Sequence, residues 1–235
     1  SDPDGLMSVN GGSVRNIMSG ALATTTATRD LASTVGAEGT TTWLGFLVQP
    51  HATSLLGDYM GIEFGSSSAD IGFAGYNGTS FVLERAGGSG RVTVSGITPT
   101  AGQTYFIALK IESAAGNDTV TMYVDPTPGA STPDSSYTAV KSNLDLGTFT
   151  RIGIATGQGL SSNRAELDEL RVGDSYLDVA PGLVVTTTAD INASGIVDGN
   201  ASQDIAWLNA HRGTDISLRE AIIAANNTAG ANAIT

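Results

Sequence analysis

The sequence contains no cysteine and very little lysine. Without cysteine, disulfide bonds and thiolate metal sites are excluded. Only Lys110 and Lys141 are lysines, and 11 basic residues against 23 acidic ones give a formal net charge of −12. Such a surface repels nucleic-acid phosphates and anionic lipids, so we predict a chain that does not bind nucleic acid.

Long apolar runs are also missing. No run of about 18 apolar residues occurs, so we predict no membrane insertion. Nothing resembles a signal peptide, and the chain begins Ser-Asp-Pro rather than with Met. We therefore expect a part of a longer polypeptide.

Short alternating segments dominate the first three quarters of the chain. In 104–112, Tyr105, Ile107, Leu109 and Ile111 share one face, as strand residues two apart should. "SAAGND" then predicts the loop of a β-hairpin. Many short strands with Gly-rich turns favour an antiparallel two-sheet jelly-roll sandwich, a mainly β fold. The predicted strands are 42–49, 60–64, 70–76, 80–85, 90–95, 104–112, 119–124, 149–155 and 165–172.

The residues from Pro181 onward have a different character. Ser217 and Glu220 form the S-x-x-E pattern of a helix capping box. Leu218, Ile222 and Ala225 follow at helical spacing as one apolar face. We predict a sandwich domain at 1–180 and a short β/α segment at 181–235, with the boundary at Pro181-Gly182.

Seven stretches between Trp43 and Val179 carry a family resemblance. In order, they are "TTWLGFLVQP", "YMGIEFG", "IGFAGYNG", "YFIALKIE", "TMYVDPTPG", "LDLGTFTRIGIATG" and "LDELRVGDSYLDV". Together they resemble bacterial laminin-G-like, concanavalin A-like modules of exported proteins. The resemblance implies the same jelly-roll fold and an extracellular or cell-surface location.

A second resemblance lies in "VVTTTADINASGIVDGN" and "GTDISLREAIIAANNTAGANAIT". These are similar to the segment that precedes right-handed parallel β-helices in large bacterial surface proteins. Ile216 stands where that family often has cysteine. The resemblance implies an end cap on a β-helix whose body lies outside this chain. A capped amphipathic helix lying on the sandwich is the alternative.

Catalytic patterns are weak. Laminarinase-like hydrolases that share the jelly roll need carboxylates at alternate positions of one strand, as E-x-D-x-E. In "AELDELRV", Glu166 and Asp168 could share a face, but Glu169 falls on the other. His51 and His211 show no triad pattern, and no HExxH, P-loop or dinucleotide fingerprint occurs. We predict a protein that is not an enzyme.

Calcium is the better-supported chemistry. On a regular strand Asp168 would share its face with Leu170 and Val172, which puts a carboxylate at the edge of the core. Such a group needs a cation, an arginine or several N–H donors. In related jelly rolls the Asp of the last strand often holds a structural calcium, so the resemblance makes Asp168 a candidate metal ligand. An ion pair with one of the arginines or a solvated position at the rim is the alternative.

A second candidate calcium site is "DINASGIVDGN". Asp190, Asn192, Ser194 and Asp198 partly match an EF-hand loop, but Ala201 stands where the twelfth-position Glu should be. We keep Asp190, Asn192 and Asp198 as candidate metal ligands. A polar loop with Asx turns is the alternative.

Tyr76 and Asn77 in "GYNGTS" are the candidate ligand-binding residues. A Gly-flanked aromatic in a loop would suit a sugar-binding platform. We therefore expect a non-catalytic adhesion module that binds a glycan or a protein. The alternatives are a structural spacer that binds nothing and a glycoside hydrolase or lyase of jelly-roll fold.

Overall fold

The computed structural model describes residues 7–10, 13–16, 23–50, 59–66, 70–127, 132–134, 136–158, 165–180, 189–204, 207–208, 211 and 216–227. The chain divides into two compact units. We call residues 1–125 and 135–179 the sandwich, and residues 126–134 and 180–235 the C-terminal unit. No described helix is long and apolar enough to cross a membrane.

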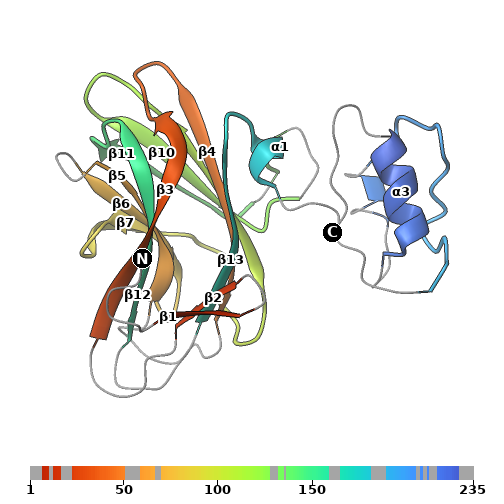
Figure 1. Ribbon diagram of the computed structural model, residues 1–235, viewed down its shortest axis with the longest axis horizontal. Coiled ribbons are helices and arrows are strands. Elements are labelled where there is room, and N and C mark those ends of the chain that lie inside the picture. Colours follow the sequence, from red (N-terminus) through yellow and green to blue (C-terminus); the bar gives the residue numbers. More distant parts are fainter. Residues whose placement is uncertain are drawn as a thin grey trace. The chain divides into compact units, whose positions relative to one another are not determined.

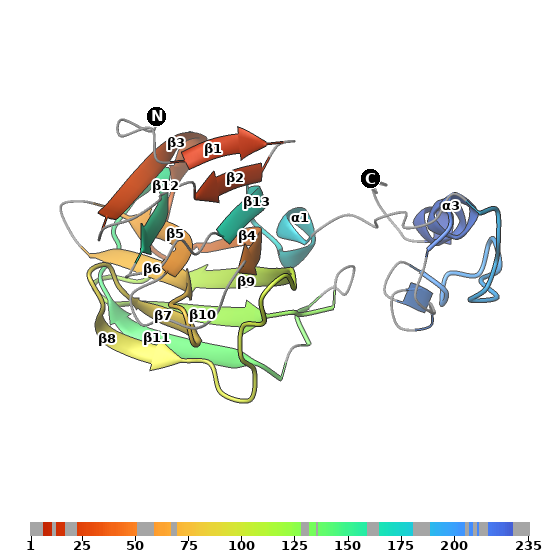
Figure 2. The same ribbon diagram turned by 90° about the horizontal axis from the view of Figure 1, so that it is seen from below.

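The sandwich consists of two antiparallel sheets packed face to face (Figures 1 and 2). The seven-stranded sheet has the order β1-β2-β13-β4-β9-β10-β11, and the six-stranded sheet has the order β3-β12-β5-β6-β7-β8. The mainly β, two-sheet sandwich predicted from the sequence is therefore confirmed. Its strands are β1 (Met7–Asn10), β2 (Ser13–Asn16), β3 (Ala23–Val35), β4 (Thr41–Pro50), β5 (Tyr59–Gly65), β6 (Ile71–Tyr76), β7 (Phe81–Arg85), β8 (Ser89–Thr93), β9 (Tyr105–Glu112), β10 (Asp118–Val124), β11 (Thr138–Leu144), β12 (Phe149–Gln158) and β13 (Ala165–Gly173).

All nine predicted strands are present, and the predicted hairpin joins β9 to β10. Gly116, in its loop, has a φ of 90°, a left-handed conformation that glycine adopts without strain. β1, β2, β3 and β11 were not predicted.

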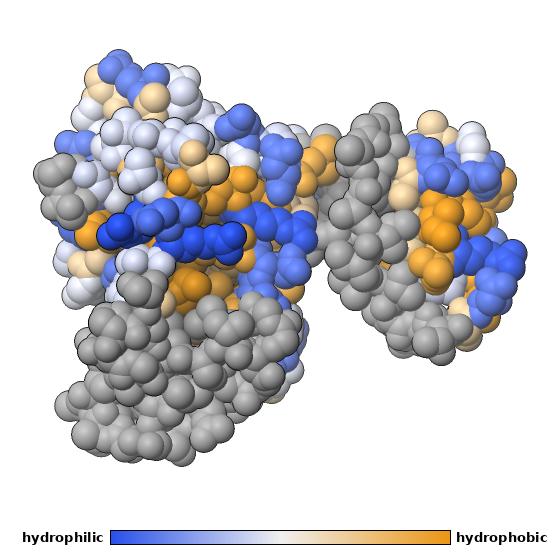
Figure 3. Space-filling view, viewed as in Figure 1, coloured by the Kyte–Doolittle hydropathy of each residue, from blue (hydrophilic) through white to orange (hydrophobic). Residues whose placement is uncertain are grey.

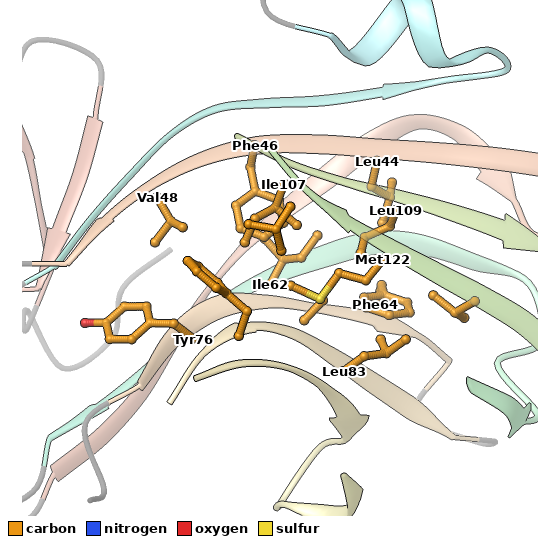
Figure 4. Close-up of a cluster of buried hydrophobic side chains, with 14 of the residues drawn as sticks. Leu44, Phe46, Val48, Ile62, Phe64, Tyr76, Leu83, Ile107, Leu109 and Met122 are labelled. Carbon is orange, nitrogen blue, oxygen red and sulfur yellow. The ribbon is translucent and has the colours of Figure 1, made fainter. Parts of the chain in front are cut away.

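The core lies between the two sheets, where alternate residues of each strand face inward. β4 contributes Leu44, Phe46 and Val48, and β5 contributes Met60, Ile62 and Phe64. All six are at most 1% exposed. In Figure 4, the labelled side chains of β4 and β5 meet those of β9 and β7 in one layer. The other face of each sheet points away from this core.

A short helix, α1 (Tyr176–Val179), lies on the outer face of the seven-stranded sheet. Tyr176 packs against Trp43 and Phe106, with ring centroids 5.6 and 6.3 Å apart. Gly45 makes this approach possible, because a Cβ there would lie 2.4 Å from the carbonyl oxygen of Val179. This face is therefore partly covered by the chain itself.

The C-terminal unit is built around α3 (Leu218–Asn227). Its small core consists of Ile196, Leu208, Ile216, Ala221 and Ala224. The predicted capping box is present, because the Ser217 N–H donates to Glu220 Oε2 at 3.0 Å and the Glu220 N–H donates to Ser217 Oγ at 3.3 Å. The β-helix cap stays a prediction, as does the boundary at residue 181.

The predicted apolar face of α3 points to solvent. Leu218 is 55% exposed and Ile222 is 45% exposed, while Ala221 and Ala224 face the small core. Figure 3 shows apolar atoms at the surface of this unit beside hydrophilic ones. The buried face of α3 thus consists of two alanines and two polar residues, Glu220 and Asn227, and sequence periodicity did not select it.

Candidate ligand-binding face

The six-stranded sheet exposes an outer face that carries polar side chains and glycines. Because side chains alternate along a strand, the residues between Met60, Ile62 and Phe64 point away from the core. Glu63 lies there, opposite Gly153 of β12 on one side and Phe73 of β6 on the other. This row across three strands is the centre of the candidate site.

A hollow of about 580 Å³ opens on this face, beside β3, β12 and β5. Its size falls within the usual range for small-molecule sites, about 300–1,000 Å³. Hydroxyl groups dominate its polar lining, with one carboxylate and one guanidinium. The lining residues are Thr26, Thr28, Thr34, Glu63, Phe64, Gly65, Ser66, Ile71, Thr148, Phe149, Thr150, Arg151 and Gly153.

Gly153 shapes the floor of the hollow. A Cβ at this position would lie 2.7 Å from Thr26 Cγ2 and 3.3 Å from the Cβ of Glu63. The missing side chain therefore lets Thr26 and Glu63 approach each other across β12. The Thr26 hydroxyl hydrogen-bonds to the Glu63 carboxylate.

Burial raises the pKa of Glu63 above its usual value, and the hydrogen bond from Thr26 offsets only part of this effect. No described residue forms an ion pair with Glu63. The guanidinium at the rim, Arg151, is already engaged, because its Nε lies 2.8 Å from Asp30 Oδ1. The hollow thus holds a partly desolvated carboxylate that lacks a cationic partner within the described part of the chain.

An apolar cluster adjoins the hollow on the same face. It consists of Phe73, Val82 and Ala155, with Tyr59 packed against them. Tyr59 and Phe73 meet edge to face at 5.6 Å. Burial, followed by the charges of Glu63 and Glu84, raises the pKa of Tyr59 and keeps its phenol protonated at neutral pH.

Asp168 does not lie where a regular strand would place it. Between Asp168 and Arg171 the pairing of β13 with β4 slips, and Glu169 has a φ of 54°. This β-bulge leaves Leu167 and Leu170 on the core side. The prediction that Asp168 shares a face with Leu170 and Val172 is therefore wrong.

Asp168 instead shares the outer face of the seven-stranded sheet with Glu166. Both line a hollow of about 200 Å³ together with Leu47, Gln49 and Thr104. Asp168 Oδ1 accepts the Glu169 N–H at 2.8 Å. Glu169 does not line this hollow, but it lines another one with Asp168 and Leu170.

Calcium binding by Asp168 stays a prediction, and one substitution tests it. If Asp168 holds calcium, Asp168→Asn should lower the melting temperature in calcium and leave it unchanged in chelator. The expected drop is about 2–4 °C for each kcal/mol of calcium stabilisation that is lost. Equal melting shifts in calcium and in chelator would remove Asp168 as a ligand.

The side chains proposed for the second calcium site point to different partners. Both carboxylate oxygens of Asp190 accept from Arg219 at 2.6 Å. Asn192 Nδ2 donates to the Ile196 carbonyl at 3.0 Å, and the Ser194 hydroxyl donates to Glu220 at 2.8 Å. Asp198 is exposed. The segment is thus a polar loop closed by hydrogen bonds, and no group of three or more metal-ligating His, Cys, Asp or Glu residues occurs among the described residues.

Tyr76 and Asn77 do not form a ligand platform. Tyr76 is the last residue of β6, is 2% exposed and lies in the core cluster (Figure 4). The expectation of a loop aromatic is therefore wrong, because the strand extends to Tyr76 and turns its ring inward. Asn77 Oδ1 accepts the Ser80 N–H at 3.2 Å and closes the turn between β6 and β7.

No protein-family model and no curated protein matches the sequence. Similar solved structures include a bifunctional GH43-CE protein of Bacteroides eggerthii, with 14% identity and a TM-score of 0.44 over 74% of this chain. The chain spans only 24% of that protein. The exoplasmic/lumenal domain of VIP36, in a Ca²⁺/Man3GlcNAc-bound form, has 10% identity and a TM-score of 0.48, over 75% of this chain and 84% of that one. The carbohydrate-binding module CBM66 from Bacillus subtilis has 9% identity and a TM-score of 0.45, over 73% of this chain and 93% of that one.

Proposed function

We propose that the sandwich is a non-catalytic carbohydrate-binding module of a larger bacterial surface or secreted protein. The glycan would bind in the hollow on the outer face of the six-stranded sheet. The observation that carries the proposal is the lining of that hollow. Six Thr and Ser residues there supply hydroxyls, which donate and accept hydrogen bonds as sugar hydroxyls do.

A catalytic alternative has one observation in its favour. Glu63 and Glu84 lie on the same face, on either side of Phe73. Two strand spacings separate their backbones by roughly 10 Å, near the upper end of the carboxylate separation of inverting glycosidases. However, Glu84 is only 6% exposed and its Oε2 lies 2.5 Å from Arg91 Nε. A carboxylate so covered and paired is poorly placed to act on a substrate, so binding without catalysis is the better proposal.

The test is a glycan array, probed with the protein in calcium and again in chelator. Thr28 lines the hollow, and Thr28→Tyr should fill it and reduce binding at least tenfold. Thr93 lies on the same face of the same sheet, outside the hollow, so Thr93→Tyr is the matched control and should bind like the parent.

Three outcomes separate the hypotheses. Binding lost in Thr28→Tyr alone supports a glycan site in the hollow. Equal binding by both variants would place the glycan elsewhere and contradict the proposal. No binding to any glycan would favour a structural spacer or a protein-binding module. Loss of binding in chelator would mean that glycan binding requires calcium.

A further inference from the structure

The carboxylate of Glu63 is the unusual charge on the outer face of the six-stranded sheet. Transfer of an ionised carboxylate out of water is costly unless a cation or several hydrogen-bond donors accompany it. Glu63 has the Thr26 hydroxyl as its hydrogen-bond donor, and no described cation pairs with it. A cationic group of a ligand in the hollow would therefore compensate the charge of Glu63.

The other charged groups around the hollow do not supply that cation. Arg151 lines the hollow but pairs with Asp30 at the exposed rim. Glu84, on β7 two strands from β5, pairs with Arg91 of β8. Among the described charges that face this part of the sheet, Glu63 is thus the one that no cation accompanies, and it is negative.

We propose that the ligand of this hollow is an amino sugar, a glycan with a protonated amine that ion-pairs with Glu63. This inference rests on the proposed function, because it assumes that the hollow binds glycan. The amine would supply the missing cation, while the surrounding threonine hydroxyls bond to the sugar hydroxyls. Partial burial strengthens the attraction relative to bulk water.

The same charges disfavour acidic glycans. A uronate or sulfate in the hollow would meet the Glu63 carboxylate directly. The net charge of −12 adds a long-range repulsion that weakens as salt is added. Neutral sugars would leave Glu63 without a cationic partner, so they should bind more weakly than amino sugars.

The experiment measures affinity by calorimetry for glucosamine, N-acetylglucosamine, glucose and galacturonate oligomers of equal length. Tetralysine is included as a cation without sugar. The parent protein should bind the glucosamine oligomer at least tenfold more tightly than any other probe. Glu63→Gln should remove this preference, because the amide keeps the shape and loses the charge.

Glu38→Gln is the matched control. Glu38 is an exposed residue outside the hollow, and its substitution changes the net charge by the same amount. It should alter the affinity for the glucosamine oligomer less than twofold.

The Glu63→Gln variant should melt no lower than the parent at pH 7. Burial raises the pKa of Glu63, so ionisation of this side chain costs the folded protein stability. The free energy of unfolding therefore falls as pH rises from the ordinary pKa of glutamate through the raised one.

Acidification gives a second readout. Binding of the glucosamine oligomer should weaken as pH falls through the raised pKa of Glu63, and Glu63→Gln should abolish this dependence. Tyr59, Glu84, Arg91, Arg151 and Asp30 face the same region and are unchanged in that variant.

Several results would overturn the inference. Equal affinity for glucose and glucosamine oligomers in the hollow, unchanged in Glu63→Gln, would leave the proposed function intact and remove the amino sugar. Tight binding of the galacturonate oligomer would also leave the proposed function intact and contradict the amino sugar. Tetralysine bound as tightly as the sugar would show recognition of an amine alone. Failure of all the oligomers and of the glycan array would instead contradict glycan binding itself.

Discussion

Replacing Glu220 by alanine should unfold the C-terminal unit and leave the sandwich folded. Glu220 is fully buried, and both of its carboxylate oxygens accept hydrogen bonds. Oε1 accepts from the N–H and hydroxyl of Ser194, each at 2.8 Å. Oε2 accepts from the Ser217 N–H at 3.0 Å, while the Ser217 hydroxyl donates to the Ile191 carbonyl at 2.5 Å. One side chain thus joins the start of α3 to a loop 26 residues earlier.

The expected effect is large because alanine leaves these donors without an acceptor. An unsatisfied buried polar group costs about 1–3 kcal/mol, and two backbone N–H groups and the Ser194 hydroxyl are involved. Among its described residues the unit has a small core of five buried apolar residues, and small units have little stability to lose. We therefore expect the substitution to exceed the stability of the unit.

Scanning calorimetry and limited proteolysis would measure this effect. The parent should show a transition for the C-terminal unit that Glu220→Ala abolishes, with early cleavage after residue 180. Arg219→Ala is the neighbouring control, because it removes an exposed ion pair with Asp190 on the same helix and should leave the unit folded. Loss of the sandwich transition together with that of the unit would show that the division into two units is wrong.

The same interaction predicts acid sensitivity. Burial alone would raise the pKa of Glu220, but the hydrogen bonds from Ser194 and Ser217 outweigh it and lower the pKa below its usual value. A lowered pKa means that the stabilisation is present above the ordinary pKa of glutamate and is lost as pH falls through the lowered one. The C-terminal unit should therefore melt at lower temperature in acid, and Glu220→Gln should weaken this dependence.

Alternation in the sequence predicted nine strands because their inward residues are large and apolar. β3 lacks this signal, since its sequence is ATTTATRDLASTV and it lies at the end of its sheet among the described strands. In β11 the inward positions include Lys141, which is 5% exposed and donates to the Gly90 carbonyl at 2.7 Å. Because a lysine stands at an inward position, β11 does not show the alternation of apolar residues that predicts a strand.

Face assignments failed where the backbone departed from regular geometry. The bulge at Glu169 moved Asp168 to the opposite face from Leu170, although the strand itself was predicted. A shift of one residue reverses the faces of everything beyond it, and no residue pattern in "LDELRVG" signals the shift. Site predictions that depend on the face of a strand are therefore less secure than the strand.

The candidate hollow was partly visible in the sequence. Glu63 is the single charged residue of the predicted strand 60–64, and alternation with Met60, Ile62 and Phe64 already placed it outside the core. What makes it a site is the meeting of β5 with β3 and β12, which lie far away in the sequence. The Glu63 carboxylate is partly buried without a cation because these distant strands come together, so local sequence patterns do not reveal the site.

Phe46→Ala should lower the free energy of unfolding of the sandwich by about 3–5 kcal/mol. Phe46 is fully buried and lies among Ile62, Ile107 and their neighbours in the core (Figure 4). It belongs to β4, which pairs with both β9 and β13. The cost combines lost apolar burial with a cavity that two paired sheets cannot close. The melting temperature should fall by roughly 6–20 °C.

Val140→Ala is the control, because Val140 is 54% exposed on β11 and its truncation should change stability by less than about 0.5 kcal/mol. A drop below about 1 kcal/mol for Phe46→Ala would mean that the core relaxes around the cavity and that the packing described here is wrong. Phe46 projects from the seven-stranded sheet into the core, whereas the hollow opens on the outer face of the six-stranded sheet. Well below its melting temperature, Phe46→Ala should therefore bind glycan like the parent, which separates stability from recognition in the variants of Thr28 and Glu63.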